Sequence, residues 1–292
     1  MRIRSYQVGA TVVAFILLAP LPARATDEIQ VYNAEIADVG QWTVQQHLNY
    51  TFDGQKQPGF PRGLVSNHAL NGTPEFGYGI TDWWELGLYA PFAVNGDGRF
   101  LSNGAKIRNL FVSPNADKRN FFYGINFEFS YETPPFSQTR YGLEIRPIIG
   151  VRNPQWEFIV NPIVDLGFGA LGEQDFAPAA RIARNLGNDR FIGLEYYADF
   201  GQIGNFLPVS EQSHQLFVVT DFKVDKFDIE LGLGYGLTSG SDRLIAKAIV
   251  GYAFPAPGKG DGDRMAPMTP VVNRASSRAP LPGMDLGPIG LR

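Results

Sequence analysis

The sequence contains no cysteine. This absence excludes disulfide frameworks, thiolate nucleophiles and cysteine-ligated metal sites, and it is typical of chains that work in an oxidising compartment. Histidine is scarce, and His47, His68 and His214 stand at no spacing typical of a metal site. We find no nucleophile-elbow, zinc-protease or phosphate-loop motif. The sequence therefore predicts no catalytic residue, no cofactor and no metal site, and we expect a protein that is not an enzyme.

Long apolar runs are also missing, because no stretch approaches the ~20 apolar residues that a transmembrane helix needs. The longest run, from Val8 to Leu18, follows Arg2 and Arg4 and precedes a small-x-small site at residues 23–25. This order is typical of a secretory signal peptide, which we place at residues 1–25. The exported chain can therefore span a membrane only as a β-barrel.

Basic residues are too few to neutralise the acidic ones. The chain has 25 basic and 29 acidic residues, and removing Arg2, Arg4 and Arg24 with the signal peptide leaves 22 against 29, a formal charge of −7. An acidic chain of this kind is a poor partner for a phosphate backbone, so we expect no nucleic-acid partner.

Glycine and aromatic residues are abundant, and alternation of apolar and polar residues dominates the chain. Within 41–52 every even position except Gln46 is apolar, and the odd positions are polar, which is the period of a β-strand. The same reading gives twelve strands of 8 to 13 residues, which matches the ~9–11 residues that a tilted membrane-crossing strand needs. The predicted strands are 41–52, 70–80, 84–94, 105–112, 121–132, 140–151, 156–168, 176–185, 191–200, 214–224, 227–237 and 243–254.

A secreted β-sandwich would also alternate, and two further patterns favour a barrel. Connections after odd strands include the long segments 53–69, 95–104 and 201–213, whereas most others are tight; 113–120 is an exception. Aromatic residues gather at both strand ends. One rim includes Trp42, Trp84, Trp156, Phe191 and Phe227, and the other includes Tyr50, Phe52, Phe92, Tyr131, Phe168 and Phe200. These features predict an all-β fold, a transmembrane antiparallel up-and-down β-barrel of about 12 strands in outer-membrane lipid, with both chain ends in the periplasm.

The predicted barrel occupies residues 40–254. Its last strand ends in Tyr252 and Phe254, and this Tyr-x-Phe pattern resembles the terminal strand that the barrel-assembly machinery recognises. Residues 26–39 form a periplasmic N-terminal segment, which either enters the barrel mouth as a plug or packs beneath it. Residues 255–292 are rich in proline and glycine and are predicted to be a disordered periplasmic tail.

Several segments resemble a known family. They are 28–36 (EIQVYNAEI), 78–88 (YGITDWWELGL), 193–197 (GLEYY) and 241–244 (SDRL). Over 27–254 the chain is similar to a proteobacterial family of outer-membrane β-barrels labelled for a MetA pathway of phenol degradation and described as transporter-like. The resemblance implies an outer-membrane location and a channel for aromatic or other small compounds.

The polar faces of the predicted strands carry many charges. The candidate lumen-lining residues are Glu75, Glu85, Glu128, Glu144, Arg146, Glu157, Asp165, Glu195, Asp199, Glu230, Arg243 and Lys247. Such charges either line a narrow pore or fill a closed barrel with ion pairs, because twelve strands lie between the filled eight and the open sixteen. We expect a passive channel for small solutes, including aromatic or hydrophobic ones, with a weak preference for cations. A closed barrel with a structural or surface-interaction role is the alternative, and an outer-membrane enzyme is a third reading.

Overall fold

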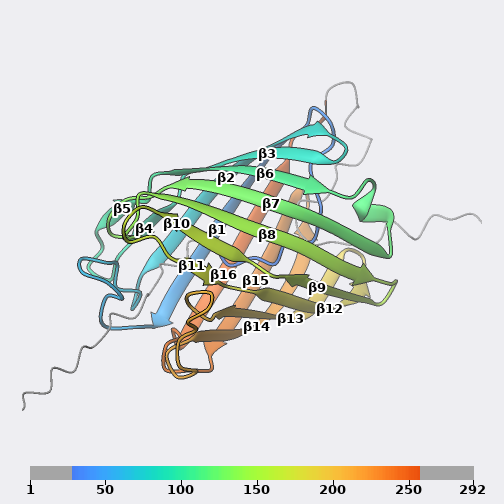
Figure 1. Ribbon diagram of the computed structural model, residues 1–292. Helices are drawn as coiled ribbons and strands as arrows, with labels where there is room; N and C mark the ends of the chain where they lie inside the picture. The colour runs from blue at the N-terminus through green and yellow to red at the C-terminus, as the bar shows by residue number, and fades with distance from the viewer. Residues whose placement is uncertain (1–27, 257–292) are drawn as a thin grey trace, which may run out of the picture.

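The structure, a computed structural model, describes residues 28–256. Within them one antiparallel sheet closes on itself, since β1 (Trp42–Asp53) pairs with both β2 (Leu70–Thr81) and β16 (Leu244–Ala253). The wall is a tilted up-and-down barrel (Figure 1). This confirms the predicted fold and its twelve transmembrane strands.

Eight of the twelve strands are continuous. Besides β1, β2 and β16 they are β7 (Phe121–Tyr131), β8 (Tyr141–Arg152), β13 (Arg190–Asp199), β14 (Ser213–Val224) and β15 (Phe227–Gly236). Each of the other four consists of two elements. These are β3 (Trp84–Tyr89) with β4 (Phe92–Val94), β5 (Phe100–Ser102) with β6 (Ala105–Val112), β9 (Trp156–Asn161) with β10 (Val164–Phe168), and β11 (Gln174–Phe176) with β12 (Ala179–Gly187).

Proline explains three of the four interruptions. Pro91, Pro162 and Pro178 lie between the paired elements, and a proline cannot donate a backbone hydrogen bond to the neighbouring strand. Pairing resumes beyond each break, for instance between β10 and β8. The strand predicted at 176–185 begins earlier in the structure, because β11 starts at Gln174. Likewise, the expected loop 95–104 contains β5, which pairs with β4.

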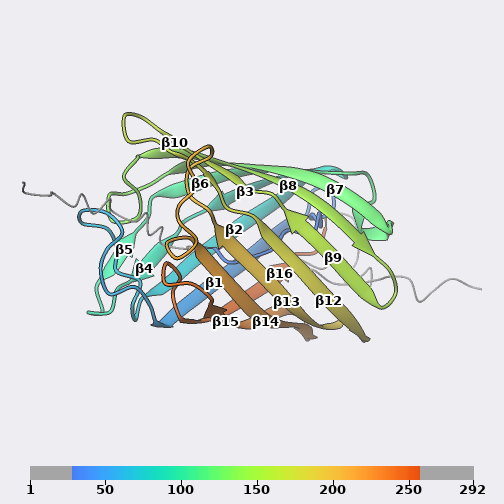
Figure 2. The same ribbon diagram turned by 60° about the horizontal axis from the view of Figure 1, so that its bottom comes forward.

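The two ends of the barrel differ in their connections, as Figures 1 and 2 show. The end that we call the loop end carries the connections 54–69, 95–99, 132–140, 169–173, 200–212 and 237–243. The end that we call the turn end carries 82–83, 113–120, 153–155, 188–189 and 225–226. Only 113–120 is long there, and it includes the 3-10 helix η1 (Ala116–Lys118). No helix within residues 28–256 is long and apolar enough to cross a bilayer.

Apolar side chains cover the outer face of the wall. Alternation places Leu231, Leu233 and Tyr235 of β15 outward and exposed. Trp42, Phe121 and Phe227 lie exposed at the turn end, and Phe52, Tyr131 and Phe168 lie exposed at the loop end. An apolar band between two aromatic girdles fits a bilayer and its interfaces.

Phe191 is an exception to the predicted girdle. Its side chain is buried inside the barrel, where it packs against Ala183 of β12. Phe191 is the second residue of β13 and follows Arg190 in a tight turn, so its alternation sets it inward and Ile192 outward. The aromatic residue nearest the strand start is therefore not always the one that faces lipid.

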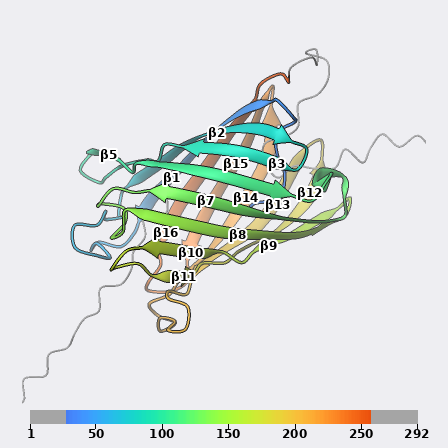
Figure 3. The same ribbon diagram turned by 45° about the horizontal axis from the view of Figure 1, so that its top comes forward.

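The ends of the chain are described only in part. The predicted signal peptide 1–25 lies outside the described residues, as does the predicted tail beyond Ala256. Residues 28–39 are described, and most of them lie inside the barrel (Figure 3), where Ile29, Val31 and Tyr32 are buried, whereas Val39 at the end of the segment is exposed. Of the two placements left open by the sequence, the structure shows the plug and not the segment packed beneath the barrel.

Candidate functional site: a lumen occupied by the N-terminal segment

The N-terminal segment, residues 28–39, joins two apolar clusters of the barrel interior. Ile29 packs with Phe217, Val219 and Ile245. Farther along the segment, Val31, Tyr32 and Ala34 pack in a second cluster that includes Phe122 and Ile148 of β7 and β8. The apolar residues of the segment thus remove apolar parts of the wall from water, which favours its position in the lumen.

Charged side chains of the wall bind the backbone of the segment. Arg146 donates to the Gln30 carbonyl oxygen over 3.1 Å, Arg152 donates to that of Asn33 over 3.3 Å, and Lys247 donates to that of Ile29 over 3.1 Å. The segment has no regular secondary structure, so these groups replace the ladder bonds that its carbonyl oxygens lack.

Asn161 of β9 completes this recognition from the wall. Its Oδ1 accepts from the Tyr32 amide over 2.7 Å, and its Nδ2 donates to the Tyr32 carbonyl oxygen over 3.0 Å. The Arg146 guanidinium lies 4.2 Å from the centre of the Tyr32 ring. The Tyr32 hydroxyl donates to Glu28, and burial raises the pKa of this phenol well above its ordinary value. Tyr32 is therefore neutral, and its backbone, ring and hydroxyl group each have a partner.

The far end of the segment is fixed where it leaves the barrel. The Gly40 amide donates to the Gly79 carbonyl oxygen over 2.8 Å, and Ala37 donates its amide to Glu85. A Cβ at Gly79 would lie 2.2 Å from the Asp38 carbonyl oxygen. Only glycine at position 79 permits this close approach.

A first ion cluster lies beside the segment, around Arg108 of β6. Its guanidinium bridges Glu85 and Glu75, with 2.7 Å to the Glu75 Oε1 atom. The Glu75 Oε2 atom lies 3.3 Å from His47 Nε2. All four side chains are buried, so Glu75 and Glu85 share the positive charge of Arg108 away from bulk water.

A second ion cluster surrounds Arg181 of β12 and Lys247 of β16. Arg181 binds Glu195 at 2.6 Å and also contacts Asp221, and it lies 3.7 Å from both Glu157 and Glu230. Lys247 lies 2.5 Å from Glu195 and 2.5 Å from Glu230. The two basic groups therefore hold four carboxylates from four strands together across one side of the lumen.

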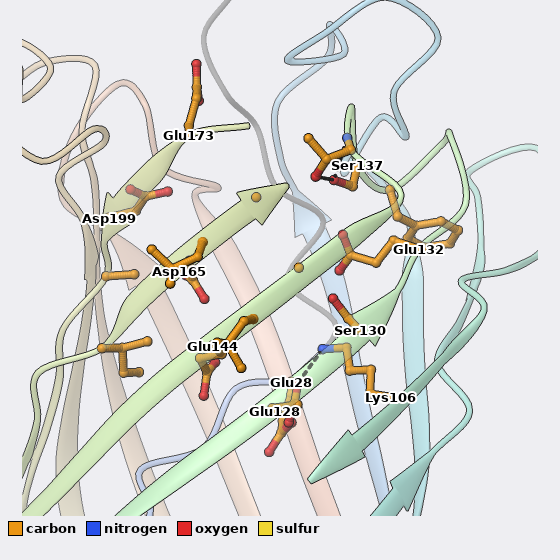
Figure 4. A pocket seen from close by; sticks show the side chains of 18 of the residues that line it. Glu28, Lys106, Glu128, Ser130, Glu132, Ser137, Glu144, Asp165, Glu173 and Asp199 are labelled. Carbon is orange, nitrogen blue, oxygen red and sulfur yellow. Dashed lines mark hydrogen bonds and ion pairs between the residues drawn. The ribbon is translucent and has the colours of Figure 1, made fainter. Parts of the chain in front are cut away.

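A cavity of 250 Å³ lies on the loop-end side of the segment, and we call it the vestibule. Glu28, Ile29 and Gln30 of the segment line its inner end, and residues 136–139 and Leu171 of the loops are also in its lining. Figure 4 shows carboxylates on its opposite sides, with Glu132 facing Asp165 and Asp199. A much smaller cavity of 40 Å³ lies on the other side of the segment, lined by Tyr32 and Ile36 among others. The segment thus separates the lumen into two spaces.

One group of side chains within residues 28–256 has the composition of a metal site. Glu28, His47 and Glu75 bring a ligand atom each to within 4.8 Å of one another. Two of these groups already have partners, because Glu75 binds Arg108 and Glu28 accepts from Tyr32. We therefore assign no metal to this group.

The histidine environments bear on enzymatic chemistry. His214 accepts or donates to Tyr196 and Gln212, and His47 contacts Glu75. Within residues 28–256 neither imidazole bonds to a serine hydroxyl. A serine nucleophile paired with histidine, one form that an outer-membrane enzyme could take, has no counterpart in the contacts of His47 and His214.

The structure places most of the candidate lumen-lining residues inside the barrel. Those buried in the two ion clusters or bound to the segment are Glu75, Glu85, Arg146, Glu157, Glu195, Glu230 and Lys247. Glu128, Glu144, Asp165 and Asp199 line the vestibule. Arg243 does not face the lumen. It is exposed, precedes β16 and lies over the outward-facing ring of Tyr235, because strand alternation does not govern a residue in the connection.

Arg108 and Asp221 belong to the two ion clusters and were not among the candidates. Arg108 and Asp221 lie on β6 and β14, whose sequences alternate poorly, so their faces could not be assigned. The spacing of Lys106, Arg108 and Leu110 at every second residue would have placed all three on one face. The contacts of the N-terminal segment with Asn161 and Arg146 had no local signal, because these partners are more than a hundred residues away in the sequence.

The fold has relatives among solved structures. An outer membrane channel from Pseudomonas putida F1 matches with a TM-score of 0.55 at 11% identity, covering 78% of this chain and 100% of that chain. The KdgM porin matches with a TM-score of 0.48 at 13% identity, covering 73% of this chain and 99% of that chain. The sequence matches no protein-family model and no curated protein. At 11% identity the likeness to the Pseudomonas channel concerns the barrel fold alone.

Proposed function

We propose that this protein is a passive outer-membrane channel for small solutes, and that its N-terminal segment occludes the pore. The observation that supports this most directly is the division of a polar lumen by residues 28–39. The segment forms no strand or helix. Apolar packing and side chains of the wall hold most of it, and its backbone meets the sheet at Val39 and Gly40, beside Gly79. Such contacts can be exchanged for water one at a time.

The orientation follows from the connections. Long connections face the cell exterior in membrane barrels and short ones face the periplasm. We therefore place the loop end and the vestibule outside, and the turn end, where the segment leaves the barrel, in the periplasm. In this orientation a solute enters the vestibule first and meets the segment next.

Displacement of the segment toward the turn end would join the two spaces of the lumen. It would leave Arg146, Arg152 and Lys247 without the carbonyl oxygens that they bind, but these groups retain Glu144, Glu157 and Glu195 as ion partners. The open lumen would therefore keep compensated charges on its wall. We propose small solutes, including aromatic ones, as the cargo, because twelve strands lie between barrels that side chains fill and barrels that leave a wide channel.

Liposome swelling tests the proposal. Vesicles with the full chain and vesicles with a chain that lacks residues 28–39 are compared in isosmotic solutions of a pentose and a trisaccharide. We expect the deletion to swell at least tenfold faster in the pentose, with little swelling in the trisaccharide. A deletion variant that folds and inserts but admits neither sugar would contradict a channel.

That outcome would favour a closed barrel. The two ion clusters supply the observation behind this second candidate, because they extend from opposite walls into the lumen and are buried even beside the segment. If these clusters fill the barrel when the segment is absent, the protein serves a structural or surface-interaction role.

A further inference from the structure

We propose that the vestibule binds a small organic cation, namely a protonated amine on an apolar or aromatic body. This inference rests on the proposed function, because it names the solute class that the entrance of the channel selects. It is carried by the charge, the unsatisfied polar atom and the apolar surface of one cavity.

The charge of the vestibule is strongly unbalanced. Its lining includes two basic side chains, Lys106 and Arg146, and seven carboxylates. The seven are Glu28, Glu128, Glu132, Glu144, Asp165, Glu173 and Asp199. Lys106 binds Glu128 at 2.8 Å and Arg146 binds Glu144 at 2.7 Å, so the two basic groups are already committed. The negative excess of a walled cavity concentrates cations.

Glu128 supplies an independent sign of a missing partner. Its side chain is 4% exposed and lines the vestibule, and only its Oε1 atom is bound by Lys106. The Oε2 atom is buried without a hydrogen-bond partner among the described residues. A buried carboxylate oxygen without a donor is costly, and an ammonium group entering beside it would supply the donor.

Apolar side chains decide between an organic cation and a hydrated metal ion. Phe60 and Phe136 from two different loops line the same cavity, together with Leu166 and Leu171. A hydrated ion gains nothing from such surface, whereas the body of an organic amine is removed from water against it. The volume of 250 Å³ suits a compact ligand.

The site also reaches the N-terminal segment. Glu28 lines the vestibule, and it accepts a hydrogen bond from the Tyr32 hydroxyl. A cation that binds Glu28 competes with one of the contacts that hold Tyr32. Ligand binding is therefore coupled to the anchorage of the segment.

Calorimetric titration of the purified full chain in detergent tests the site. The probes are 2-phenylethylammonium, 3-phenylpropionate as an anion of similar shape, and magnesium chloride. We expect saturable binding of the ammonium probe, which weakens as salt rises, and binding at least tenfold weaker for the anion and for the metal ion.

The variant Glu132→Gln/Asp165→Asn removes two charges that face each other across the cavity (Figure 4). We expect it to weaken binding of 2-phenylethylammonium about tenfold. Asp97→Asn is the control, because Asp97 is an exposed loop carboxylate outside the lining, and it should bind as the unmodified chain does. Circular dichroism checks that each barrel is folded.

The outcomes separate this site from the channel. Absence of ammonium binding, equal binding of the anion, or tighter binding of magnesium would overturn the site and leave the swelling result untouched. Binding of the ammonium probe by a barrel whose deletion variant admits no sugar would overturn the channel and retain the site.

Discussion

At the scale of single residues, Arg181 has the largest structural role in the lumen. Its side chain is fully buried and faces Glu157, Glu195, Asp221 and Glu230. Removing one partner of a buried ion pair leaves charges that neither water nor a counter-charge compensates. The arrangement depends on Arg181 because Lys247 reaches only two of the four carboxylates.

We therefore predict that Arg181→Gln destabilises the barrel by about 3–5 kcal/mol. Urea unfolding in lipid vesicles, followed by tryptophan fluorescence, measures the change. Arg184→Gln is the matched control, since Arg184 lies on the same strand but is exposed beside Trp156. Equal free energies of unfolding for the two variants would show that Arg181 does not compensate the buried carboxylates of the cluster.

Phe254 is the residue on which the assembly signal is tested. It lies 46% exposed just beyond β16, and its ring lies 5.0 Å from that of Tyr252. We predict that Phe254→Asp lowers the amount of folded protein in the outer membrane several-fold, because a charge replaces an apolar ring at the interface. Val209→Asp in a loop is the control. Normal levels of the Phe254 variant in membrane fractions would refute a role in assembly.

At the scale of elements, the contact between β2 and the N-terminal segment depends on Gly79. A Cβ at this position would meet the carbonyl oxygens of Ala37 and Asp38 at 2.7 and 2.2 Å. We predict that Gly79→Ala loosens the segment at a cost of about 1–3 kcal/mol, since the backbone must shift. The strand itself pairs through backbone groups and should persist.

Hydrogen exchange of peptides that cover residues 28–39 measures this effect. We expect exchange at least tenfold faster in Gly79→Ala than in the unmodified chain. Gly142→Ala is the control, because its Cβ would meet the Ser130 hydroxyl at 2.8 Å and no part of the segment. Unchanged exchange would mean that the segment is held without this contact.

Local periodicity predicted the strands because the alternation of apolar and polar residues is a property of neighbouring positions within one strand. β15 and β16 match 227–237 and 243–254 closely, since their outer faces are uniformly apolar. The interruptions at Pro91, Pro162 and Pro178 could have been predicted from proline alone. Partner choice in the lumen could not, because the pairing of Arg108 with Glu75 and Glu85 depends on which strands become neighbours.

The plug is the element that sequence reasoning left undecided. Ile29, Val31 and Tyr32 indicated an apolar segment, but a lumen and a partner surface outside the barrel would bury it equally well. Its position is set by contacts with Asn161, Arg146 and Lys247 from three separate strands. No local pattern carries that information.

At the scale of the whole molecule, the asymmetry of the two ends predicts the topology. A tag inserted near Gly59 or Asn205 in the loop-end connections should bind antibody on intact cells. A tag at Asp225, in a turn-end connection, should bind only after the outer membrane is permeabilised. The reverse pattern of labelling would invert the barrel and place the vestibule in the periplasm.

The charge of the lumen has a consequence for conduction. Acidic residues outnumber basic ones in the vestibule lining, and in the second ion cluster four carboxylates share Arg181 and Lys247. Cation selectivity should therefore arise both at the entrance and deeper in the lumen, and it should fall as salt screens the charges over ~8–10 Å. A chain without residues 28–39 should show a weak cation preference in its reversal potential.

Closure of the pore by the N-terminal segment can be measured as ionic current. In single-channel recordings from planar bilayers, the full chain is compared with the chain that lacks residues 28–39. We expect the full chain to be closed for most of the recording and the deletion variant to show stable openings of uniform size. Equal conductance of the two folded proteins would contradict occlusion by the segment, and absence of current through the deletion variant would contradict the pore.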